Sequence, residues 1–282
     1  MDAKLVNIYK TTLSDKDFKR LSVYIQGNYG IKMPDVKKPI LQGRLHKRLK
    51  KLQISDFKTY VDFVFSKEGE SEIIHMIDVV STNKTDFFRE PVHFEYLEQE
   101  ILPKIYKEKG GVKISVWSAG CSSGEEPYTL AIILNEFKEK NKGFDFEIIA
   151  TDISTKVLKQ GANAIYLEEK IDVIPLSLKK KYFLKSKNPT EQKVKVVKEL
   201  RQKVKFQRLN FMDKNYNINE TFDIIFCRNA LIYFERENQE LVINKLSNKL
   251  KPNGYFFLGH SESITNMNVP LKSLIPTVFN KI

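Results

Sequence analysis

Apolar residues in the first part of the chain recur at the spacing of α-helices. Every third or fourth position of residues 39–54 is a leucine, which predicts a helix with one apolar face. That face consists of Leu41, Leu45, Leu49 and Leu52. A helical pattern precedes it and ends at Gly27 or Gly30, because glycine is a natural helix stop. Another follows over residues 55–65 and opens with a serine N-cap, so we predict a small all-α domain over residues 1–80.

From residue 112 onward the pattern changes to apolar strands that alternate with helices. Strands are predicted at 112–120, 146–152, 203–211, 222–229 and 255–261. Helices are predicted at 125–140, 154–166 and 238–254. Strands and helices of these lengths are typical of βαβ units and a parallel sheet, so we assign residues 81–282 to one α/β domain. The rhythm breaks at about 174–204, where a Lys-Asn-Pro-Thr turn and an alternating strand predict a small antiparallel insertion.

Composition limits the class of protein. The chain has 282 residues, 41% of them apolar, and no apolar run long enough to span a bilayer. Its N-terminus lacks the apolar core of a signal peptide, and its two cysteines and four scattered histidines give no disulfide framework or metal spacing. We therefore expect a reduced, cytoplasmic protein without a metal site. The net charge of +12 favours an acidic partner, although lysines spread over most segments explain much of it.

The most informative segment is 116–131, VWSAGCSSGEEPYTLA, where an apolar strand enters a loop of small residues and then a helix. Gly120 and Gly124 carry no Cβ, so a ligand can approach the backbone closely. Asp152 lies 28 residues past Gly124 at the end of the next strand, where it can accept hydrogen bonds from a ribose diol. The alternatives are an ordinary strand–turn–helix for the loop and a helix N-cap for Asp152.

Two carboxylates indicate the charge of the ligand. Glu125 and Glu126 follow the loop where a pyrophosphate would need bare amides, and the loop matches neither GxGxxG nor a phosphate loop. These side chains would repel phosphate and attract a cation. An adenosine-like ligand with a positive charge fits best, and S-adenosylmethionine is the obvious candidate because it carries a sulfonium and an ammonium group.

Two further clusters combine polar and aromatic residues. Residues 82–89 (TNKTDFFR) link the two predicted domains, and residues 227–233 (CRNALIY) follow an apolar strand. Ligands bind outside the carboxyl ends of strands in open α/β sheets, which makes the second cluster a candidate site. The structural alternatives are a helix cap within the first cluster and a half-buried aromatic at Tyr233.

Together these segments resemble one family, the bacterial chemotaxis receptor methyltransferases of the CheR type, which are protein-glutamate O-methyltransferases. The matching stretches are TNKTDFFREPVHFEYL, WSAGCSSGEEPYTLA, ATDISTKVL, FCRNALIYFERENQ and NGYFFLGHSESI. Their order and spacing also match, so the resemblance covers nearly the whole chain. It implies a Rossmann-like class I methyltransferase sheet with a small all-α N-terminal domain (1–80) and a methyltransferase domain (81–282) that contains a β-subdomain (about 174–204).

The resemblance also implies a reaction and assigns roles. The reaction transfers a methyl group from S-adenosyl-L-methionine to receptor glutamates and leaves S-adenosyl-L-homocysteine. Arg89 and Tyr233 match the residues that position the substrate carboxylate and are our candidate catalytic residues. Glu126, rather than Glu125, matches the acidic cofactor contact, and Asp152 matches the ribose-binding acid. The other implied cofactor contacts are Asn83, Thr85, Arg89, Asn210, Phe211, Arg228 and Asn229, of which Phe211 departs from the leucine that the family often has.

The residue types suit this chemistry. A glutamate side chain is ionised at neutral pH, with an ordinary pKa of about 4.3, so methyl transfer to it needs no general base. Arg89 can bind a carboxylate through its forked donors, and Tyr233 can donate a hydrogen bond to the attacking oxygen. Because family substrates are acidic Glu/Gln-rich helices, we expect the basic stripe beside the leucine face to dock the receptor. That stripe consists of Arg44, Lys47, Arg48 and Lys51, and the alternative is an ordinary solvent-exposed face.

Two other functions remain open. One is a methyltransferase for RNA or a small molecule, although no basic motif interleaved with aromatic residues supports RNA, and we expect no nucleic-acid partner and no membrane insertion. The other is a cofactor sensor or scaffold without catalysis, which the loss of Arg89 or Tyr233 would have favoured. The insertion at about 174–204 lacks the glycines of family members that tether to a receptor tail, which argues against tethering here.

Overall fold

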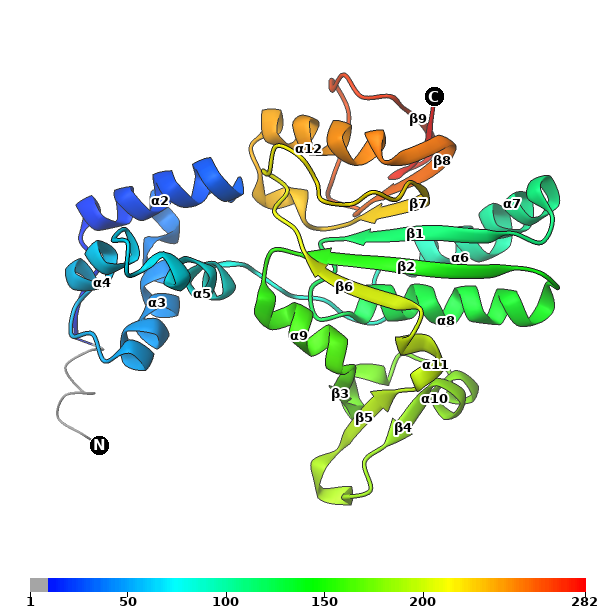
Figure 1. The fold of residues 1–282 in the computed structure, drawn as a ribbon, viewed down its shortest axis with the longest axis horizontal. Helices are drawn as coiled ribbons and strands as arrows, with labels where there is room; N and C mark the ends of the chain where they lie inside the picture. The colour runs from blue at the N-terminus through cyan, green and yellow to red at the C-terminus, as the bar shows by residue number, and fades with distance from the viewer. Residues whose placement is uncertain (1–9) are drawn as a thin grey trace.

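The first part of the computed structural model, which describes residues 10–282, is a bundle of helices drawn in blue and cyan in Figure 1. Its helices are α2 (Asp15–Tyr29), the 3-10 helix η1 (Asp35–Lys37), α3 (Lys38–Leu52), α4 (Phe57–Val64) and α5 (Glu70–Val80). The predicted leucine face of α3 is confirmed, because Leu41, Leu45 and Leu49 are buried in the core of the bundle. Helix α2 ends at the second predicted stop, Gly30, whose φ of 71° is left-handed.

The N-cap of α4 differs from the prediction by one residue. Asp56 accepts a hydrogen bond from the Thr59 backbone N–H at 2.8 Å, whereas Ser55 only donates its hydroxyl to the Asp56 carboxylate. Serine and aspartate are both good N-caps, and the aspartate also interacts favourably with the positive end of the helix dipole. The apolar pattern could not separate two capping residues that stand side by side.

One residue of the predicted basic stripe is buried, which corrects that part of the expectation. The Arg48 guanidinium forms a two-bond ion pair with Glu72 of α5, with Nε 2.6 Å from Oε1, and only 8% of its side chain is exposed. The Tyr60 hydroxyl donates to the same carboxylate at 3.0 Å. Position 48 lies beside the leucine face of α3, and a carboxylate from another helix compensates its charge. The sequence pattern of α3 alone could not reveal that partner.

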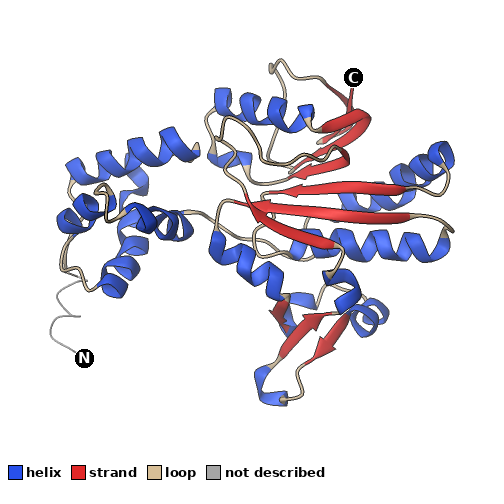
Figure 2. Cartoon of the chain, in the orientation of Figure 1, coloured by secondary structure: helices blue, strands red, loops and turns tan. Residues whose placement is uncertain are grey.

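The second part of the chain is built on a seven-stranded sheet, shown in red in Figure 2. The strand order is β6 (Val204–Arg208), β2 (Asp145–Asp152), β1 (Lys113–Ala119), β7 (Phe222–Cys227), β8 (Leu250–Leu258), β10 (Val278–Lys281) and β9 (Leu271–Ile275). The first five strands are parallel, as predicted, and β10 pairs antiparallel with both β8 and β9. This is the predicted Rossmann-like class I methyltransferase sheet.

Helices cover both faces of this sheet, which explains why its strands are apolar without alternation. On one face Val116 of β1 joins a core formed with α6 (Pro91–Tyr96), a π-helical turn (Leu97–Ile101), α7 (Leu102–Lys109) and α8 (Glu125–Lys140). On the other face its neighbour Trp117 joins a core formed with α12 (Arg236–Asn248).

Two predicted helices are too long at their C-terminal ends. Helix α9 covers Thr155–Asn163, and Ala164 ends it in the left-handed region before strand β3 (Ile165–Leu167). Helix α12 stops at Asn248, and Leu250 already pairs with Phe222 in the sheet. The hairpin of β9 and β10 was not predicted. Strand β3 and the start of β8 form because of partners distant in sequence, which a local pattern does not report, whereas β9 pairs with the adjacent β10.

The predicted antiparallel insertion is confirmed as a three-stranded sheet in the order β3, β5 (Lys193–Val196), β4 (Phe183–Lys185). It begins earlier than residue 174, because β3 supplies one of its edges. The 3-10 helices η3 (Glu168–Ile171) and η4 (Pro189–Glu191) and the helices α10 (Leu176–Tyr182) and α11 (Lys198–Arg201) complete it. In Figure 1 this small sheet projects below the main one.

The carboxyl ends of β1 and β2 point toward the helical bundle (Figure 1). The order β2-β1-β7 places adjacent crossovers on opposite sides of β1, and such a switch point is where open α/β sheets bind ligands. Within residues 10–282, no helix has both the length and the apolar character to cross a membrane.

Candidate active site

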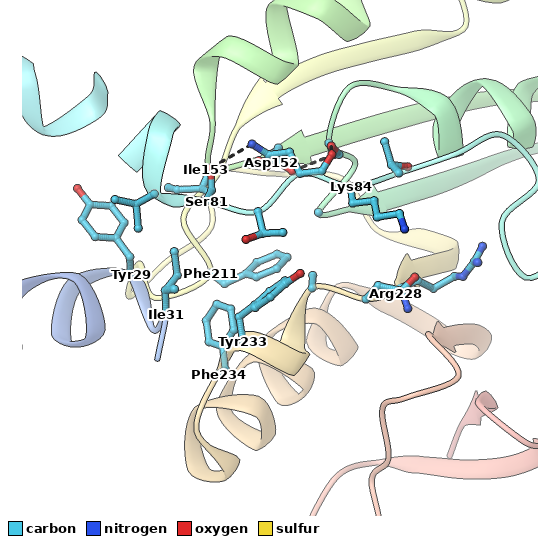
Figure 3. A pocket seen from close by; sticks show the side chains of 18 of the residues that line it. Tyr29, Ile31, Ser81, Lys84, Asp152, Ile153, Phe211, Arg228, Tyr233 and Phe234 are labelled. Carbon is cyan, nitrogen blue, oxygen red and sulfur yellow. Dashed lines mark hydrogen bonds between the residues drawn. The ribbon is translucent and has the colours of Figure 1, made fainter. Parts of the chain in front are cut away.

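A single cavity lies between the helical bundle and the carboxyl ends of β1, β2 and β7 (Figure 3). In Figure 3, Phe211, Tyr233 and Phe234 enter from one side, Asp152 lies across from them, and Tyr29 and Ile31 come from the bundle. The cavity brings together every residue to which the family resemblance gave a role in cofactor binding or catalysis. They are Asn83, Thr85, Arg89, Glu126, Asp152, Asn210, Phe211, Arg228, Asn229 and Tyr233.

The two glycines of the loop after β1 have different surroundings. Gly120 lines the cavity with φ at 85°, and a Cβ there would lie 2.9 Å from the Ala230 side chain and 3.9 Å from the Phe211 ring. Gly124, with φ at 98°, faces Gly161 of α9, whose Cα would be 2.9 Å from such a Cβ. Gly120 is therefore the glycine at which a ligand can approach the backbone closely. Gly124 instead allows the loop to pack tightly against α9, which was the structural alternative.

Asp152 is fixed by the backbone on both of its carboxylate oxygens. Oδ2 accepts from the Ser122 N–H and Oδ1 from the Ser154 N–H, each at 2.9 Å. Burial raises the pKa of this carboxyl, and the two backbone donors oppose that shift. The N-cap of α9 is Ser154, which accepts from the Val157 N–H, so the alternative that Asp152 caps the helix is wrong. A second lone pair on each oxygen remains suited to a diol.

Only one of the two glutamates after the loop lines the cavity. Glu126 accepts from the Ser118 hydroxyl at 2.7 Å and lies 3.5 Å from an Arg228 nitrogen. Glu125 points elsewhere, is 3% exposed and accepts from the Ser123 hydroxyl. Burial raises the pKa of both carboxyls, and the positive charge of Arg228 opposes this for Glu126.

The segment that links the bundle to the sheet crosses the cavity without forming a helix. The Ser122 hydroxyl donates to the Asn83 carbonyl at 2.9 Å, which joins this linker to the glycine loop. Thr85 and Asp86 cap nothing, because the next helix begins at Pro91, and Asp86 pairs with Lys170 instead. Phe87 packs into the core beneath. The Arg89 side chain donates to the Lys84 carbonyl at 3.1 Å and is 37% exposed.

The loop after β7 presents one charged and one aromatic group. Arg228 is buried and lies 3.2 Å from a Glu90 oxygen as well as 3.5 Å from Glu126, so two carboxylates hold its guanidinium. Tyr233 lies in the 3-10 helix η5 (Leu231–Tyr233) and is half-buried. Within residues 10–282 its hydroxyl has no hydrogen-bond partner, so this group is available to a ligand.

Direct hydrogen bonds hold the helical bundle over the cavity. Asp78 of α5 accepts from the hydroxyls of Ser154 and Thr155 at 2.8 Å each. The Asn210 side-chain amide donates to the Asn28 carbonyl at 2.8 Å, and the Lys32 N–H donates to the Tyr233 carbonyl at 2.7 Å. Asn210 therefore contributes to domain contact as well as to the cavity wall.

The bundle supplies a wall that the sequence motifs did not reveal. It consists of Tyr29, Ile31, Met33, Lys37, Ile40, Leu41 and Arg44. Arg44, expected on the docking stripe, donates to the carbonyls of Val80 and Ser81 and to the Thr82 hydroxyl, and so holds the linker. Of that stripe, only Lys47 and Lys51 are exposed. The helical period marked the leucine face of α3, which includes Leu41, but not its proximity to a distant sheet.

One group of side chains has the composition of a metal site. Single ligand atoms of Glu90, His93 and His260 lie within 4.8 Å of one another, although their sequence spacing gave no such signal. Burial lowers the pKa of His93 to about 4, so its ring is neutral at pH 7. The Glu90 carboxylate already accepts from Arg228 and from the Asn229 amide. A cation would have to compete with that guanidinium, which makes the cluster a poor metal site.

Two family models match almost the whole chain. One, described as CheR methyltransferase, all-alpha domain, matches residues 16–81, and the other, CheR methyltransferase, SAM binding domain, matches residues 83–278. A chemotaxis protein methyltransferase of Borreliella burgdorferi is 39% identical over 280 residues, which are 98% of this chain and 96% of that protein. One from Salmonella typhimurium is 34% identical and covers 92% of this chain and 87% of that protein.

Solved structures resemble the chain more distantly. The glycopeptide N-methyltransferase MtfA complexed with S-adenosyl-L-methionine is 13% identical and has a TM-score of 0.31. The match covers 55% of this chain and 51% of that one.

Proposed function

Because this chain belongs to the CheR methyltransferase family, we propose that it methylates glutamate side chains on the cytoplasmic helices of chemotaxis receptors. Its methyl donor is S-adenosyl-L-methionine, and the methylation serves chemotaxis. The observation that carries the proposed acceptor is that Arg89 and Tyr233 line the same cavity as Asp152 and Glu126. A carboxylate acceptor can therefore meet its positioning groups beside the donor.

The residues of the cavity fit the donor. Asp152 presents a carboxylate held by two backbone donors, which suits a ribose diol. Glu126 presents a second carboxylate, which suits a sulfonium or an ammonium group. Gly120 adds no side chain to the cavity wall, so the donor can lie close to the backbone there. When bound, the donor supplies a methyl group already activated by its sulfonium sulfur, which a carboxylate oxygen can take in an in-line displacement.

Orientation of the acceptor is the task that remains for the protein. One Arg89 nitrogen is held by the Lys84 carbonyl, and its other guanidinium donors can bind one oxygen of the acceptor carboxylate. The Tyr233 hydroxyl can donate to the attacking oxygen and fix its lone pair toward the methyl carbon. Holding two reactants in a near-attack geometry is worth about 7–11 kcal/mol, and an ionised carboxylate needs no base.

An acidic receptor helix also has a surface on which to dock. Lys47 and Lys51 lie exposed on α3, and Val36 and Ile40 expose 79% and 57% of their surface near the cavity. A helix with glutamates and apolar residues on one face would match both features. Arg48 is excluded from this surface because it is buried with Glu72. Arg44 contributes to docking only indirectly, because its guanidinium hydrogen-bonds to the linker between the bundle and the sheet.

The test is transfer of radiolabelled methyl from S-adenosyl-L-methionine to receptor-containing membranes, followed by treatment with alkali. We expect label on the receptor that alkali releases as methanol, because a carboxyl methyl ester is base-labile. Arg89→Lys should lose most of this activity, since a single point charge cannot reproduce the guanidinium fork. Arg20→Lys is the matched control and should retain it, because Arg20 pairs with Asp62 of α4 and does not line the cavity.

Other outcomes would favour a different acceptor or a different function. Alkali-stable label on the receptor would exclude a glutamate ester. Label on added RNA but not on receptor would favour a nucleic-acid methyltransferase. Binding of the donor without label on any acceptor would favour a sensing role.

A further inference from the structure

The loop that follows β7 needs support from outside itself. Residues 228–230 belong to no helix or strand, and Asn229 has a φ of 57°, in the left-handed region. The backbone N–H groups of such a loop cannot be satisfied by a ladder or a helix. This loop presents Arg228 and Asn229 to the cavity and leads directly to Tyr233. The group that satisfies its N–H donors therefore controls where these side chains lie.

That group is a glutamate from a different part of the chain. Glu262, in the turn after β8, accepts from the Asn229 N–H at 2.8 Å and from the Leu231 N–H at 2.8 Å. The same carboxylate accepts from the Gly259 N–H at 2.7 Å, which ties the β7 loop to the end of β8. Glu262 is 8% exposed and does not line the cavity. It belongs to the stretch NGYFFLGHSESI, which carried the family resemblance but had no assigned role.

A second carboxylate holds the side chains of the same loop. Glu90 accepts from the Asn229 amide at 3.0 Å and from an Arg228 nitrogen at 3.2 Å. It also accepts from the His260 N–H at 3.2 Å, so both glutamates contact the turn after β8. Glu262 differs from Glu90 because its bonds are all to backbone N–H groups. Its effect on a ligand must therefore pass through the position of the loop.

We propose that Glu262 is a positioning residue for methyl transfer, which sets the placement of Asn229 toward the donor and of Tyr233 toward the acceptor. The inference about Tyr233 rests on the proposed function, whereas the inference about Asn229 concerns only donor binding. A carboxylate is required because both of its oxygens accept hydrogen bonds. A glutamine can offer only one such oxygen and would turn an N–H donor toward the other N–H groups.

The experiment measures donor affinity by calorimetry and kcat with receptor membranes for Glu262→Gln. We expect the dissociation constant of S-adenosyl-L-methionine to rise about tenfold. We expect kcat at saturating donor and receptor to fall about 100-fold, since displacement by about 1 Å can cost that much. Glu237→Gln, on the exposed first turn of α12, is the matched control and should leave both values unchanged.

Several outcomes overturn the proposal. If Glu262→Gln is folded and has wild-type kcat and donor affinity, Glu262 does not position the loop. If only the melting temperature falls and the folded fraction, counted by its donor-binding stoichiometry, keeps wild-type kcat, the role is purely structural. If Glu262→Gln does not fold, Glu262→Asp provides the same comparison, because it keeps the carboxylate but shortens its reach.

The proposed function can fail while the proposed role of Glu262 holds. Wild-type protein that leaves receptor unlabelled would contradict the receptor as acceptor. Weaker donor binding by Glu262→Gln in that case would still support the role of Glu262 in placing Asn229.

Discussion

The two walls of the cavity differ in how their side chains are held. On the sheet wall, Asp152, Glu126 and Arg228 are largely buried, and each has at least two protein partners. On the bundle wall the groups are mostly apolar, and Ile40 keeps 57% of its surface exposed. A wall fixed before binding suits a small ligand, because little further ordering of the protein is then needed on binding. A wall with accessible apolar and basic side chains suits a larger partner that arrives and leaves.

This difference predicts that changes to the two walls have separable effects. Substitutions on the sheet wall should act on donor affinity, and those on the bundle wall should act on the receptor. Tyr233 stands between them and should act on the rate itself. The bundle wall also requires a folded bundle. A change that destabilises the bundle should therefore have the largest effect of all.

Breaking the ion pair inside the bundle should destabilise the protein most. Glu72→Gln leaves the Arg48 guanidinium buried without its charge partner, which costs about 3–5 kcal/mol. Urea unfolding followed by circular dichroism measures the change. Asp62→Asn breaks the 2.7 Å pair with Arg20, where both side chains are well exposed, and should cost much less stability because solvent screens an exposed pair. Equal losses from the two variants would contradict the difference in burial.

Removing the charge of Asp152 should weaken donor binding without changing receptor affinity. Hydrogen bonds to a charged group contribute about 1.5–3 kcal/mol, so Asp152→Asn should raise the dissociation constant of S-adenosyl-L-methionine about 10- to 100-fold. Calorimetry with the donor alone measures it. Asp172→Asn, in the β-subdomain and exposed, serves as the control. Unchanged donor affinity in Asp152→Asn would contradict the assignment of the sheet wall to the donor.

Removing the Tyr233 hydroxyl should slow the reaction but spare the binding of the donor. Its acceptor is an ionised carboxylate, and a hydrogen bond to a charged group contributes about 1.5–3 kcal/mol, so we expect Tyr233→Phe to lower kcat about 10- to 100-fold. Donor affinity should stay at the wild-type value because the ring remains. The measurement is kcat at saturating donor and receptor beside the calorimetric dissociation constant. A change in the dissociation constant of the donor without a change in kcat would show that Tyr233 acts on donor binding and not on the acceptor.

Reversing the exposed charges of α3 should give the smallest effect. Lys47→Glu with Lys51→Glu should raise the KM for receptor about 2- to 10-fold at low salt, since exposed ion pairs contribute about 0.2–1 kcal/mol each. The difference should shrink as salt is added. Lys140→Glu with Lys142→Glu, at the C-terminal end of α8 and just after it, is the control for net charge, because both side chains are exposed. Equal KM values for the two double variants would exclude α3 as the docking surface.

The sheet wall could be predicted from the sequence because its residues stand in short motifs at strand ends. The glycine loop and Asp152 indicated an adenosine-like ligand, and the two glutamates after the loop indicated its positive charge. The family resemblance added Arg89 and Tyr233. The bundle wall could not be predicted, because Tyr29, Ile31 and Ile40 meet the sheet only through the tertiary fold. The burial of Arg48 depends on Glu72, 24 residues away, and that of Glu262 on a loop more than 30 residues before it. Long-range partners of this kind leave no local pattern.

The most direct measurement is to map the methylated residues of a receptor by mass spectrometry after incubation with the protein and S-adenosyl-L-methionine. We predict one added methyl group on glutamate side chains of its cytoplasmic helices, absent when Arg89→Lys is used. Methylation of lysine, of a backbone group or of no receptor residue would contradict the assignment of this cavity to glutamate esters.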